Sequence, residues 1–291
     1  MGTHVFLNGI ILPFEKAVIP ITDRGFLYGD AVFETVRAYD GFPFQLKAHL
    51  NRLGFSATQL DIKLEDLSSI ETAIKNLLEK NELKDGVLRI TVSRGISNKR
   101  ALLEDITEPT VLIQTEELPE IPESYYSEGV KAVTMTDNRN ELCHLKNTNL
   151  LPSIIGKKNA YRKNAYEAIM ISKRGFVTEG TTSNVFGVID GTLITPPAGN
   201  KVLNGITRQV IIKIARELSI RIEEDALMGN ELSIVSELFI TNSVIEILPV
   251  TSVDDNKISS KTVGEITKKL HSGYRTVIKN WLSNLKTPVN S

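Results

Sequence analysis

The spacing of apolar and polar residues predicts strands and helices in alternation along the first third of the chain. Residues 5–12 predict a hairpin around Asn8-Gly9, a favoured two-residue turn. Residues 31–39 predict a strand, because their side chains alternate between two faces. One of these faces carries Phe33, Thr35, Arg37 and Tyr39. An arginine among aromatic residues needs a partner, which is either structural or a ligand.

The two segments that follow have the period of an α-helix, with apolar residues three or four positions apart. Residues 46–60 and 66–82 therefore predict helices, and Ser68 and Glu71 have the spacing of a capping box in the second one. Arg52 lies off the apolar stripe of the first helix. Its side chain is therefore either solvated or directed at an anion.

An acidic stretch with two prolines, residues 116–123, predicts a linker between two domains. Around and beyond it, the pattern predicts strands at 87–94, 110–115, 130–135, 168–171, 185–189 and 238–241, and helices at 152–162, 208–218 and 263–285. We therefore expect an α+β protein with a small N-terminal domain at 1–117 and a larger mixed domain at 127–291. The linker that joins them, taken from the second half of the acidic stretch onward, is expected at 118–126.

Composition and charge narrow the class of protein by exclusion. The chain has 41% hydrophobic and 24% charged residues, and its formal net charge of -1 gives no electrostatic case for nucleic acid or an anionic membrane. Cys143 is the only cysteine and the four histidines lack the spacing of metal ligands, so we expect neither a disulfide nor a metal site. The sequence also lacks the glycine-rich loops of nucleotide-binding proteins.

We expect the protein to be cytoplasmic. Its first residues show neither a signal-peptide pattern nor a myristoylation site. No uninterrupted apolar run reaches the roughly 18 residues that are needed to cross a bilayer.

Lys146 is the first candidate for chemistry. It stands between apolar neighbours in residues 144–151, where a strand-like segment gives way to a helix. A lysine removed from water loses part of its charge, and a neutral amine can attack an aldehyde to form a Schiff base. The alternative interpretation is a surface lysine at the start of a helix.

Three further segments have both a structural and a functional interpretation. Residues 205–207 precede a helix, whose free N–H groups either bind a phosphate or are simply capped. Glu179 lies among the hydroxyl residues of 178–184, which form either a polar turn or a carboxylate site for a protonated ring nitrogen. Residues 241–243 close a strand, either as a turn or as a second phosphate anchor.

Taken together, these segments resemble the fold type IV (class IV) pyridoxal-phosphate aminotransferases over nearly the whole chain. The matching motifs are Asp23-Arg24-Gly25, Tyr28-Gly29-Asp30, Phe33-Glu34 with Arg37, and residues 49–53, 145–151, 179–186, 204–208 and 241–249. The resemblance implies a small α/β N-terminal domain and a larger, β-barrel-like, mixed domain. It also implies a homodimer with sites near the subunit boundary.

The resemblance also implies the roles of individual residues around pyridoxal 5'-phosphate (PLP). Lys146 would hold the cofactor covalently as an aldimine and would move the substrate proton. Glu179 would pair with the pyridinium nitrogen, and Leu203 would pack against one face of the ring. The residues that would hold the phosphate or lie beside the cofactor are Arg52, Ser183, Asn184, Gly205, Ile206, Thr207, Thr241, Asn242 and Ser243.

The motifs that would contact the substrate are mixed. Residues 179–187 and 149–151 are similar to D-amino-acid aminotransferases, but the basic residues and histidine that bind the carboxylate there are only partly matched by Lys99 and Arg100, with Ala101 at the histidine position. Arg37 and Arg89 are similar to the branched-chain aminotransferases, but the Gly-Thr-Ala-Ala turn of those enzymes is here Thr241-Asn242-Ser243-Val244, and a tyrosine common near their lysine is here Leu150. The residues that would line the substrate site are Tyr28, Phe33, Arg37, Arg89, Lys99, Arg100, Thr182, Ser243 and Val244.

We therefore predict a transaminase that passes an amino group between a small amino acid, either a D-amino acid or a branched-chain L-amino acid, and a 2-oxo acid. The alternative is an aminodeoxychorismate lyase that makes 4-aminobenzoate and pyruvate, since Phe33-Glu34-Thr35 and Thr241-Asn242-Ser243 resemble that group. A third hypothesis is a catalytically silent scaffold that keeps the fold to bind a partner.

Overall fold

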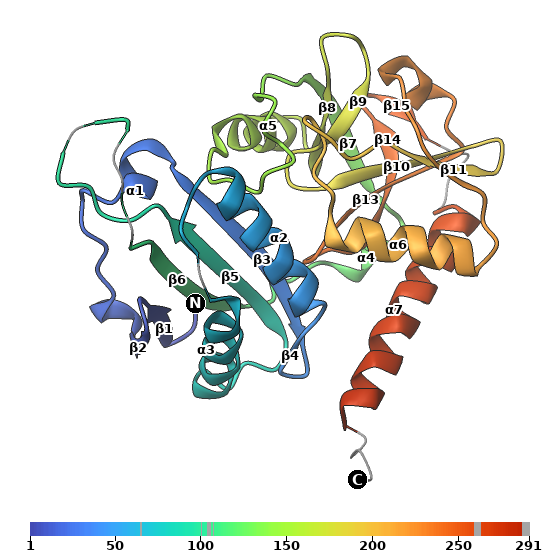
Figure 1. Ribbon diagram of the computed structural model, residues 1–291. Helices are drawn as coiled ribbons and strands as arrows, with labels where there is room; N and C mark the ends of the chain where they lie inside the picture. Colours follow the sequence, from blue (N-terminus) through green and yellow to red (C-terminus); the bar gives the residue numbers. More distant parts are fainter. Residues whose placement is uncertain (65, 100, 104–105, 107, 259–262, 287–291) are drawn as a thin grey trace. The chain divides into compact units, whose positions relative to one another are not determined.

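The computed structural model describes residues 1–64, 66–99, 101–103, 106, 108–258 and 263–286. The chain forms two compact units (Figure 1). Unit 1 comprises Met1–Pro119 and Leu145–Asn149, and unit 2 comprises Glu120–His144 and Leu150–Ser291. This division differs from the linker expected at 118–126, because helix α4 (Glu123–Ser127) already belongs to unit 2.

The segment Leu145–Asn149, which we expected in the second domain, belongs to unit 1 instead. The backbone N–H of Phe33 donates to the carbonyl of Lys146 at 2.8 Å, and that of Thr148 donates to the carbonyl of Ala31 at 3.0 Å. These bonds attach the segment to a strand that lies far earlier in the chain. Such a long-range pairing leaves no local pattern in the sequence.

Unit 1 is built on an antiparallel sheet with the strand order β2-β1-β6-β5-β3-β4. The strands are β1 (His4–Leu7), β2 (Ile10–Pro13), β3 (Ala31–Tyr39), β4 (Phe42–Pro43), β5 (Gly86–Ser93) and β6 (Thr110–Glu117). The expected hairpin at 5–12 is confirmed, since Leu7 pairs with Ile10. Asn8 and Gly9 both have positive φ angles, 46° and 95°, as a type I′ turn requires.

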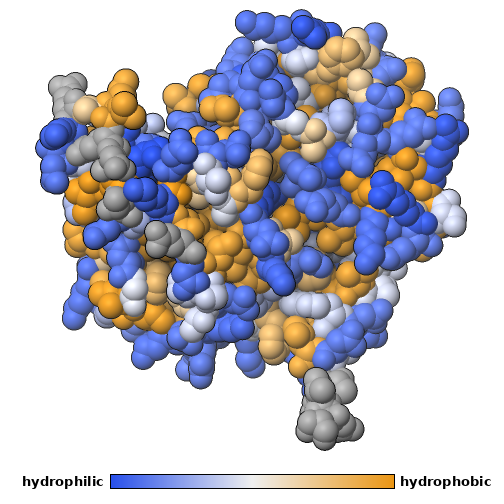
Figure 2. All heavy atoms as spheres, viewed as in Figure 1, coloured by the Kyte–Doolittle hydropathy of each residue, from blue (hydrophilic) through white to orange (hydrophobic). Residues whose placement is uncertain are grey.

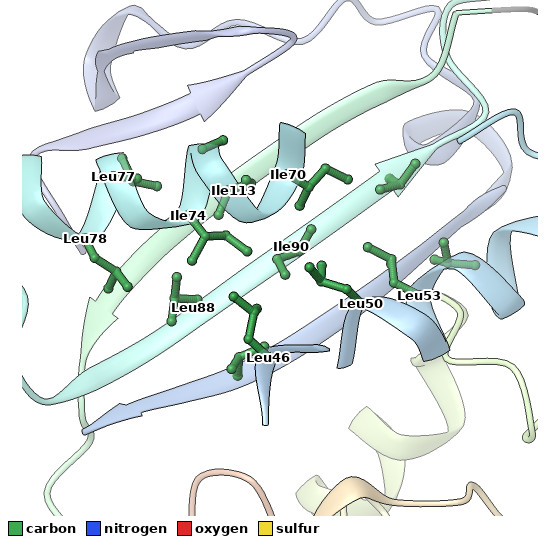
Figure 3. Packing of buried hydrophobic residues seen from close by; sticks show 14 of the residues in the cluster. Leu46, Leu50, Leu53, Ile70, Ile74, Leu77, Leu78, Leu88, Ile90 and Ile113 are labelled. Atoms are coloured by element: carbon green, nitrogen blue, oxygen red, sulfur yellow. The ribbon is translucent and has the colours of Figure 1, made fainter. Parts of the chain in front are cut away.

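Two helices cover one face of this sheet (Figure 1). The helical segments of unit 1 are α1 (Arg24–Tyr28), α2 (Leu46–Gln59) and α3 (Leu67–Lys80), with a short 3-10 turn, η1 (Phe14–Lys16). Figure 3 shows Leu50 of α2 and Ile74 of α3 packing toward Ile90 of β5, and all three are buried. The predicted helices at 46–60 and 66–82 are therefore confirmed, with their apolar stripes facing the sheet.

The expected start of α3 is wrong in one detail. Asp66, and not Ser68, caps the helix, because its carboxylate accepts a hydrogen bond from the backbone N–H of Ser68 at 2.8 Å. The carboxylate also accepts from the Ser68 hydroxyl at 2.6 Å. The hydroxyl that we assigned to the cap therefore donates to the true cap.

The opposite face of the sheet carries the two arginines of the substrate prediction. Val36 of β3 packs in the core under the helices, so its neighbours Thr35 and Arg37 point to the other face. Thr35 is paired with Arg89 in the antiparallel register, and paired residues share a face. Arg37 and Arg89 therefore lie on the same side of the sheet, away from α2 and α3.

Unit 2 contains a larger mixed sheet whose strands follow the order β12-β11-β10-β13-β14-β7-β8-β9, with β15 paired to β14. The strands are β7 (Val130–Thr136), β8 (Glu167–Ile171), β9 (Val177–Gly180), β10 (Asn184–Ile189), β11 (Thr192–Thr195), β12 (Ile222–Glu224), β13 (Glu237–Asn242), β14 (Glu246–Val253) and β15 (Asn256–Lys257). Its longer helices are α5 (Leu151–Arg162), α6 (Ile206–Glu217) and α7 (Glu265–Lys286), and η2 (Gly229–Ser233) is a 3-10 turn.

Strand β14 was not expected, although it lies between β13 and β7 in the sheet. Its sequence contains Pro249, which lacks an N–H and normally argues against a central strand. The pairing with β7 begins only at Val250, so the missing donor does not interrupt that ladder. Within the described part of the chain, no helix is both long and apolar enough to cross a membrane.

Candidate active site

Lys146 is held in unit 1 against the start of β3. Its backbone N–H donates to the hydroxyl of Ser56 at 3.3 Å, and its carbonyl accepts from Phe33. The side chain is half-buried, and its Nζ lies 4.5 Å from the centroid of the Phe33 ring. The residue is therefore not a freely solvated lysine at a helix start, since both its backbone and its amine have fixed surroundings.

Arg89 contacts the same aromatic ring. Its Cζ lies 4.0 Å from the ring centroid of Phe33, while the Cζ of Arg37 lies 4.4 Å from the centroid of Tyr39. Burial lowers the pKa of Arg89 despite the opposing charge of Glu116. Among the described residues, the side chain of Arg89 has no hydrogen-bond or salt-bridge partner. Its guanidinium is thus positioned by an aromatic ring rather than neutralised by a carboxylate.

Arg52 is fixed by a buried carboxylate. Glu34 accepts hydrogen bonds from Nε of Arg52 at 2.6 Å, from a terminal nitrogen of Arg52 at 2.8 Å and from Nδ1 of His49 at 2.7 Å. Burial alone would raise the pKa of Glu34, but the charge and hydrogen bonds of Arg52, with the bond from His49, lower it to about 2. Burial lowers the pKa of His49 despite its bond to Glu34. The guanidinium of Arg52 therefore has a defined orientation.

The other substrate residues predicted for unit 1 lie outside β3 and β5. Tyr28 ends α1, with the Cζ of Arg24 at 5.0 Å from its ring centroid. Lys99 is exposed in the loop after β5, where its carbonyl accepts a bond from Ser97. Arg100 lies outside the described residues. Phe33, Arg37 and Arg89 are therefore the predicted substrate residues that the structure places on one sheet face.

Glu179 is at the centre of a buried group in unit 2. One carboxylate oxygen accepts a hydrogen bond from Arg139, and the other accepts from the backbone N–H of Leu203 at 3.0 Å and from the amide of Asn184 at 3.4 Å. The structure thus brings together Glu179 and Leu203, which were expected at the cofactor ring, and Asn184, which was expected at the cofactor. Arg139 was missed, because its contacts reach residues far apart in the sequence.

The start of α6 lies beside this group and is uncapped. Gly205 is the N-cap residue, and no described side chain accepts a hydrogen bond from the N–H groups of the first turn. A Cβ at Gly205 would collide with the amide oxygen of Asn184. Free N–H groups at a helix start, such as those of Ile206 and Thr207, have the chemistry to bind an anion. The helix begins two residues earlier than expected.

Several predicted cofactor residues take part in turns of unit 2. The hydroxyl of Thr241 donates to the carbonyl of Glu246 at 2.6 Å. The amide of Asn242 donates to the carbonyl of Thr182 at 3.1 Å and accepts from Val244 at 2.8 Å. These contacts join the turn after β9 to the turn after β13. Ser243 lies between the two residues, half-buried.

Ser183 is bound to a second buried carboxylate that sequence reasoning missed. Glu167 is 1% exposed and accepts hydrogen bonds from the hydroxyls of Thr181 and Ser183, at 2.5 and 3.0 Å. It supports the turn that links Glu179 to Asn184. The glutamate begins β8, and only its position in an otherwise apolar strand could have drawn attention to it.

Comparison with known proteins assigns the chain to a family. A family model described as amino-transferase class IV matches residues 31–253, most of the chain. The chain belongs to the class IV aminotransferases. It is 37% identical to a Methanocaldococcus jannaschii protein named provisionally as a branched-chain-amino-acid aminotransferase, covering 95% of this chain and 97% of that protein. It is 34% identical to a D-alanine aminotransferase of Bacillus licheniformis, with 94% and 96% covered.

Solved structures extend the comparison to this fold. The branched-chain amino acid aminotransferase of Escherichia coli superposes with a TM-score of 0.88 at 27% identity, covering 95% of both chains. The PLP-form of the Thermobaculum terrenum branched-chain enzyme gives a TM-score of 0.86 at 27% identity, covering 96% of this chain and 94% of that one. The expected α+β class IV fold is confirmed, and this aminotransferase is an enzyme. The lyase alternative receives no support from these matches.

Proposed function

We propose that this aminotransferase binds PLP through a covalent bond to Lys146 and exchanges amino groups between a small amino acid and a 2-oxo acid. The observation that carries the proposal is the group in unit 2, where the buried carboxylate of Glu179 stands beside the uncapped start of α6. A carboxylate suits a protonated ring nitrogen, and free backbone N–H groups suit a phosphate. PLP carries both a basic ring nitrogen and a phosphate.

Each unit contains residues whose chemistry suits a part of PLP. In unit 2, Glu179 would meet the ring nitrogen, Leu203 would lie against the ring, and Ile206 and Thr207 would hold the phosphate. In unit 1, Lys146 would supply the amine and Arg52, fixed by Glu34, a second positive charge for the phosphate. When bound, PLP supplies an electron sink that stabilises the carbanion left at the substrate Cα.

The residues of this chain then have defined tasks. The Nζ of Lys146 takes up and returns the proton of the substrate Cα, acting as a general base and then as an acid. Phe33 limits the movement of that amine, because its ring is 4.5 Å away. Glu179 keeps a negative charge at the ring nitrogen, and the amides at the start of α6 orient the phosphate end.

For the substrate, we propose a branched-chain L-amino acid. Arg37 and Arg89 share one sheet face with the rings of Phe33 and Tyr39, a combination suited to a carboxylate beside an apolar side chain. Lys99, part of the alternative carboxylate-binding group, is exposed in its loop. A D-amino acid such as D-alanine is the second candidate, because relatives at 34% to 36% identity are D-alanine aminotransferases.

We also propose a homodimer. Large apolar side chains reach the surface in both units, as the mixture of apolar and polar groups on the face in Figure 2 illustrates. In unit 1 they include Val18, Ile21 and Phe26, and on α5 of unit 2 they include Leu151, Ile154 and Ile155. Exposed apolar side chains in such groups are typical of protein interfaces. Light scattering after size-exclusion chromatography would give twice the chain mass if the dimer forms, and the single chain mass would contradict it.

The test of the substrate is a single half-reaction. The purified enzyme is loaded with PLP, and the visible absorption band of the cofactor is followed after addition of L-leucine or D-alanine without any 2-oxo acid. We expect L-leucine to bleach the band and D-alanine to leave it. Bleaching by D-alanine alone would assign the enzyme to the second candidate. A band that neither amino acid bleaches would contradict both.

A further inference from the structure

Arg139 joins three separate parts of unit 2. Its Nε and one terminal nitrogen donate to the two carboxylate oxygens of Asp137, at 3.0 and 2.8 Å, and its other terminal nitrogen donates to Glu179. The first terminal nitrogen also donates to the carbonyl of Lys201 at 3.1 Å. A bidentate ion pair therefore fixes the plane of the guanidinium, while its free edge is presented to Glu179.

The same side chain is linked to the loop that carries Leu203. The backbone N–H of Leu203 donates to the second oxygen of Glu179 at 3.0 Å. The ammonium of Lys201, two residues earlier, donates to the carbonyl of Arg139 at 2.5 Å. The residue expected on the ring face and the residue expected at the ring nitrogen are thus both connected to one arginine.

The charges in this group are buried and opposed. The side chains of Asp137, Arg139 and Glu179 are 0%, 11% and 10% exposed. Burial alone would raise the pKa of Asp137, but the hydrogen bonds and charge of Arg139 lower it. Burial alone would lower the pKa of Arg139, but the bond to Asp137 and the charge of Glu179 raise it. Asp137 and Arg139 are therefore charged, and the guanidinium donates to the carboxylates of both Asp137 and Glu179. The half-buried Lys201 donates to backbone carbonyls instead.

From this geometry we infer that Arg139, itself oriented by Asp137, is a positioning residue that keeps Glu179 anionic and in place. The proton shared between Glu179 and the ring nitrogen then stays on the ring. The inference rests on the proposed function, because only a cofactor with a basic ring nitrogen requires such a carboxylate.

The physical reason is a competition for one proton. A proton between a carboxylate and a ring nitrogen lies on the more basic of the two atoms. A guanidinium bound to the carboxylate favours its charged form and so leaves the proton on nitrogen. Without Arg139, the buried carboxylates of Glu179 and Asp137 would be two like charges with no cation between them. Glu179 would then take up the proton. Loss of Arg139 should therefore neutralise Glu179.

The test is a double-mutant cycle on the full-length protein with PLP as the probe. The variants are Arg139→Gln, Glu179→Gln, the double substitution, and Arg139→Lys, which keeps the charge but not the planar fork. Arg94→Gln is the matched control, because Arg94 also binds a carboxylate, Asp30, at 2.7 Å and its side chain is 19% exposed. The readouts are the dissociation constant of PLP, the pH at which the visible band of the bound cofactor changes, and the midpoint of thermal unfolding.

We expect Arg139→Gln to weaken PLP binding about tenfold, the size expected for a lost charge-assisted hydrogen bond, and to move the pH of the spectral change as Glu179→Gln does. The double variant should be no weaker in PLP binding than Glu179→Gln alone. Arg139→Lys should recover part of the spectral shift. Arg94→Gln should change the unfolding midpoint only.

Additive effects in the double variant, or an Arg139→Gln spectrum identical to that of the wild type, would overturn the inference while leaving the proposed function intact. A purely structural arginine would lower the unfolding midpoint without moving the pH of the spectral change. Failure of the wild-type protein to bind PLP would overturn the proposed function itself.

Discussion

Glu34 of strand β3 holds Arg52 of helix α2 through two parallel hydrogen bonds of 2.6 and 2.8 Å, and its side chain has no exposed surface. A carboxylate so deeply buried is stable only when a cation and hydrogen bonds compensate it. The pair therefore has two consequences. It fixes the guanidinium that we propose for the phosphate, and it makes the stability of unit 1 depend on one charge.

Replacing Glu34 by glutamine should destabilise the protein by about 3 to 5 kcal/mol, because the guanidinium of Arg52 would lose its buried counter-charge. Urea unfolding measures this free energy. The matched control is Lys75→Gln, which breaks the surface pair with Glu71, where the lysine is 64% exposed. The control should unfold at nearly the wild-type urea concentration. Equal free energies of unfolding for the two variants would show that the buried pair contributes no more to stability than the surface pair.

The same carboxylate predicts how stability depends on pH. The pKa of Glu34 is lowered from 4.5 to about 2 in the folded protein, so its contribution is present above pH 4.5 and is lost as the pH falls toward 2. Full loss corresponds to roughly 3 kcal/mol. His49, whose pKa is also lowered, acts in the same direction below its ordinary value of 6.5.

The measurement is the free energy of unfolding between pH 7 and pH 3 for the wild type and Glu34→Gln. The difference between the two proteins should narrow once the pH falls below 4.5. A constant difference down to pH 3 would contradict the assignment of this dependence to Glu34.

The two candidate carboxylate-binding groups make opposite predictions. Arg89→Gln should lower kcat/KM for L-leucine by about 10- to 100-fold, since a charge-assisted contact with the substrate would be lost. It should leave stability almost unchanged, because no described carboxylate pairs with Arg89. Lys99→Gln serves as the control and should retain activity. Steady-state kinetics with both variants decides, and the reverse order of effects would favour the Lys99 loop.

Gly205 offers a test of the proposed phosphate site. A Cβ there would collide with the amide oxygen of Asn184, so Gly205→Ala should displace either that side chain, which is bound to Glu179 and Leu203, or the start of α6, and weaken PLP binding about tenfold. Gly199→Ala is a matched control, because a Cβ at that glycine meets no described atom within 4 Å and its φ is not left-handed. Titration of both apoproteins with PLP measures the effect. Equal affinities would place the phosphate elsewhere.

Local spacing was enough to predict the five longer helices and most strands of the described chain, but not the short helices α1 and α4. The ordered motifs were enough to predict the family. The features that local spacing could not predict depend on contacts between residues that are distant in the sequence. Pro249 argues against a central strand, yet β14 accommodates it because the pairing with β7 begins only at Val250. Arg139 was missed because its partners Asp137, Glu179 and Lys201 come from three segments.

The residues that were found carry a chemical signature in the sequence itself. Glu179 is an acid in a run of hydroxyl residues, and Lys146 is flanked by apolar residues before a helix. Glu34 was recognised only as part of a motif, since a lone acid in an apolar strand does not reveal which cation will compensate it. The burial of Glu34 with Arg52 needed the three-dimensional structure.

Lys146 is the residue that we propose carries the cofactor. The most direct measurement is reduction of the PLP-loaded enzyme with sodium borohydride, which makes a Schiff base permanent, followed by digestion and mass spectrometry of the peptides. We predict that the reduced cofactor is attached to the peptide containing Lys146, and that the Lys146→Ala protein folds but carries no attached cofactor and has no turnover. Attachment at another lysine, or a Lys146→Ala enzyme that still transaminates, would contradict it.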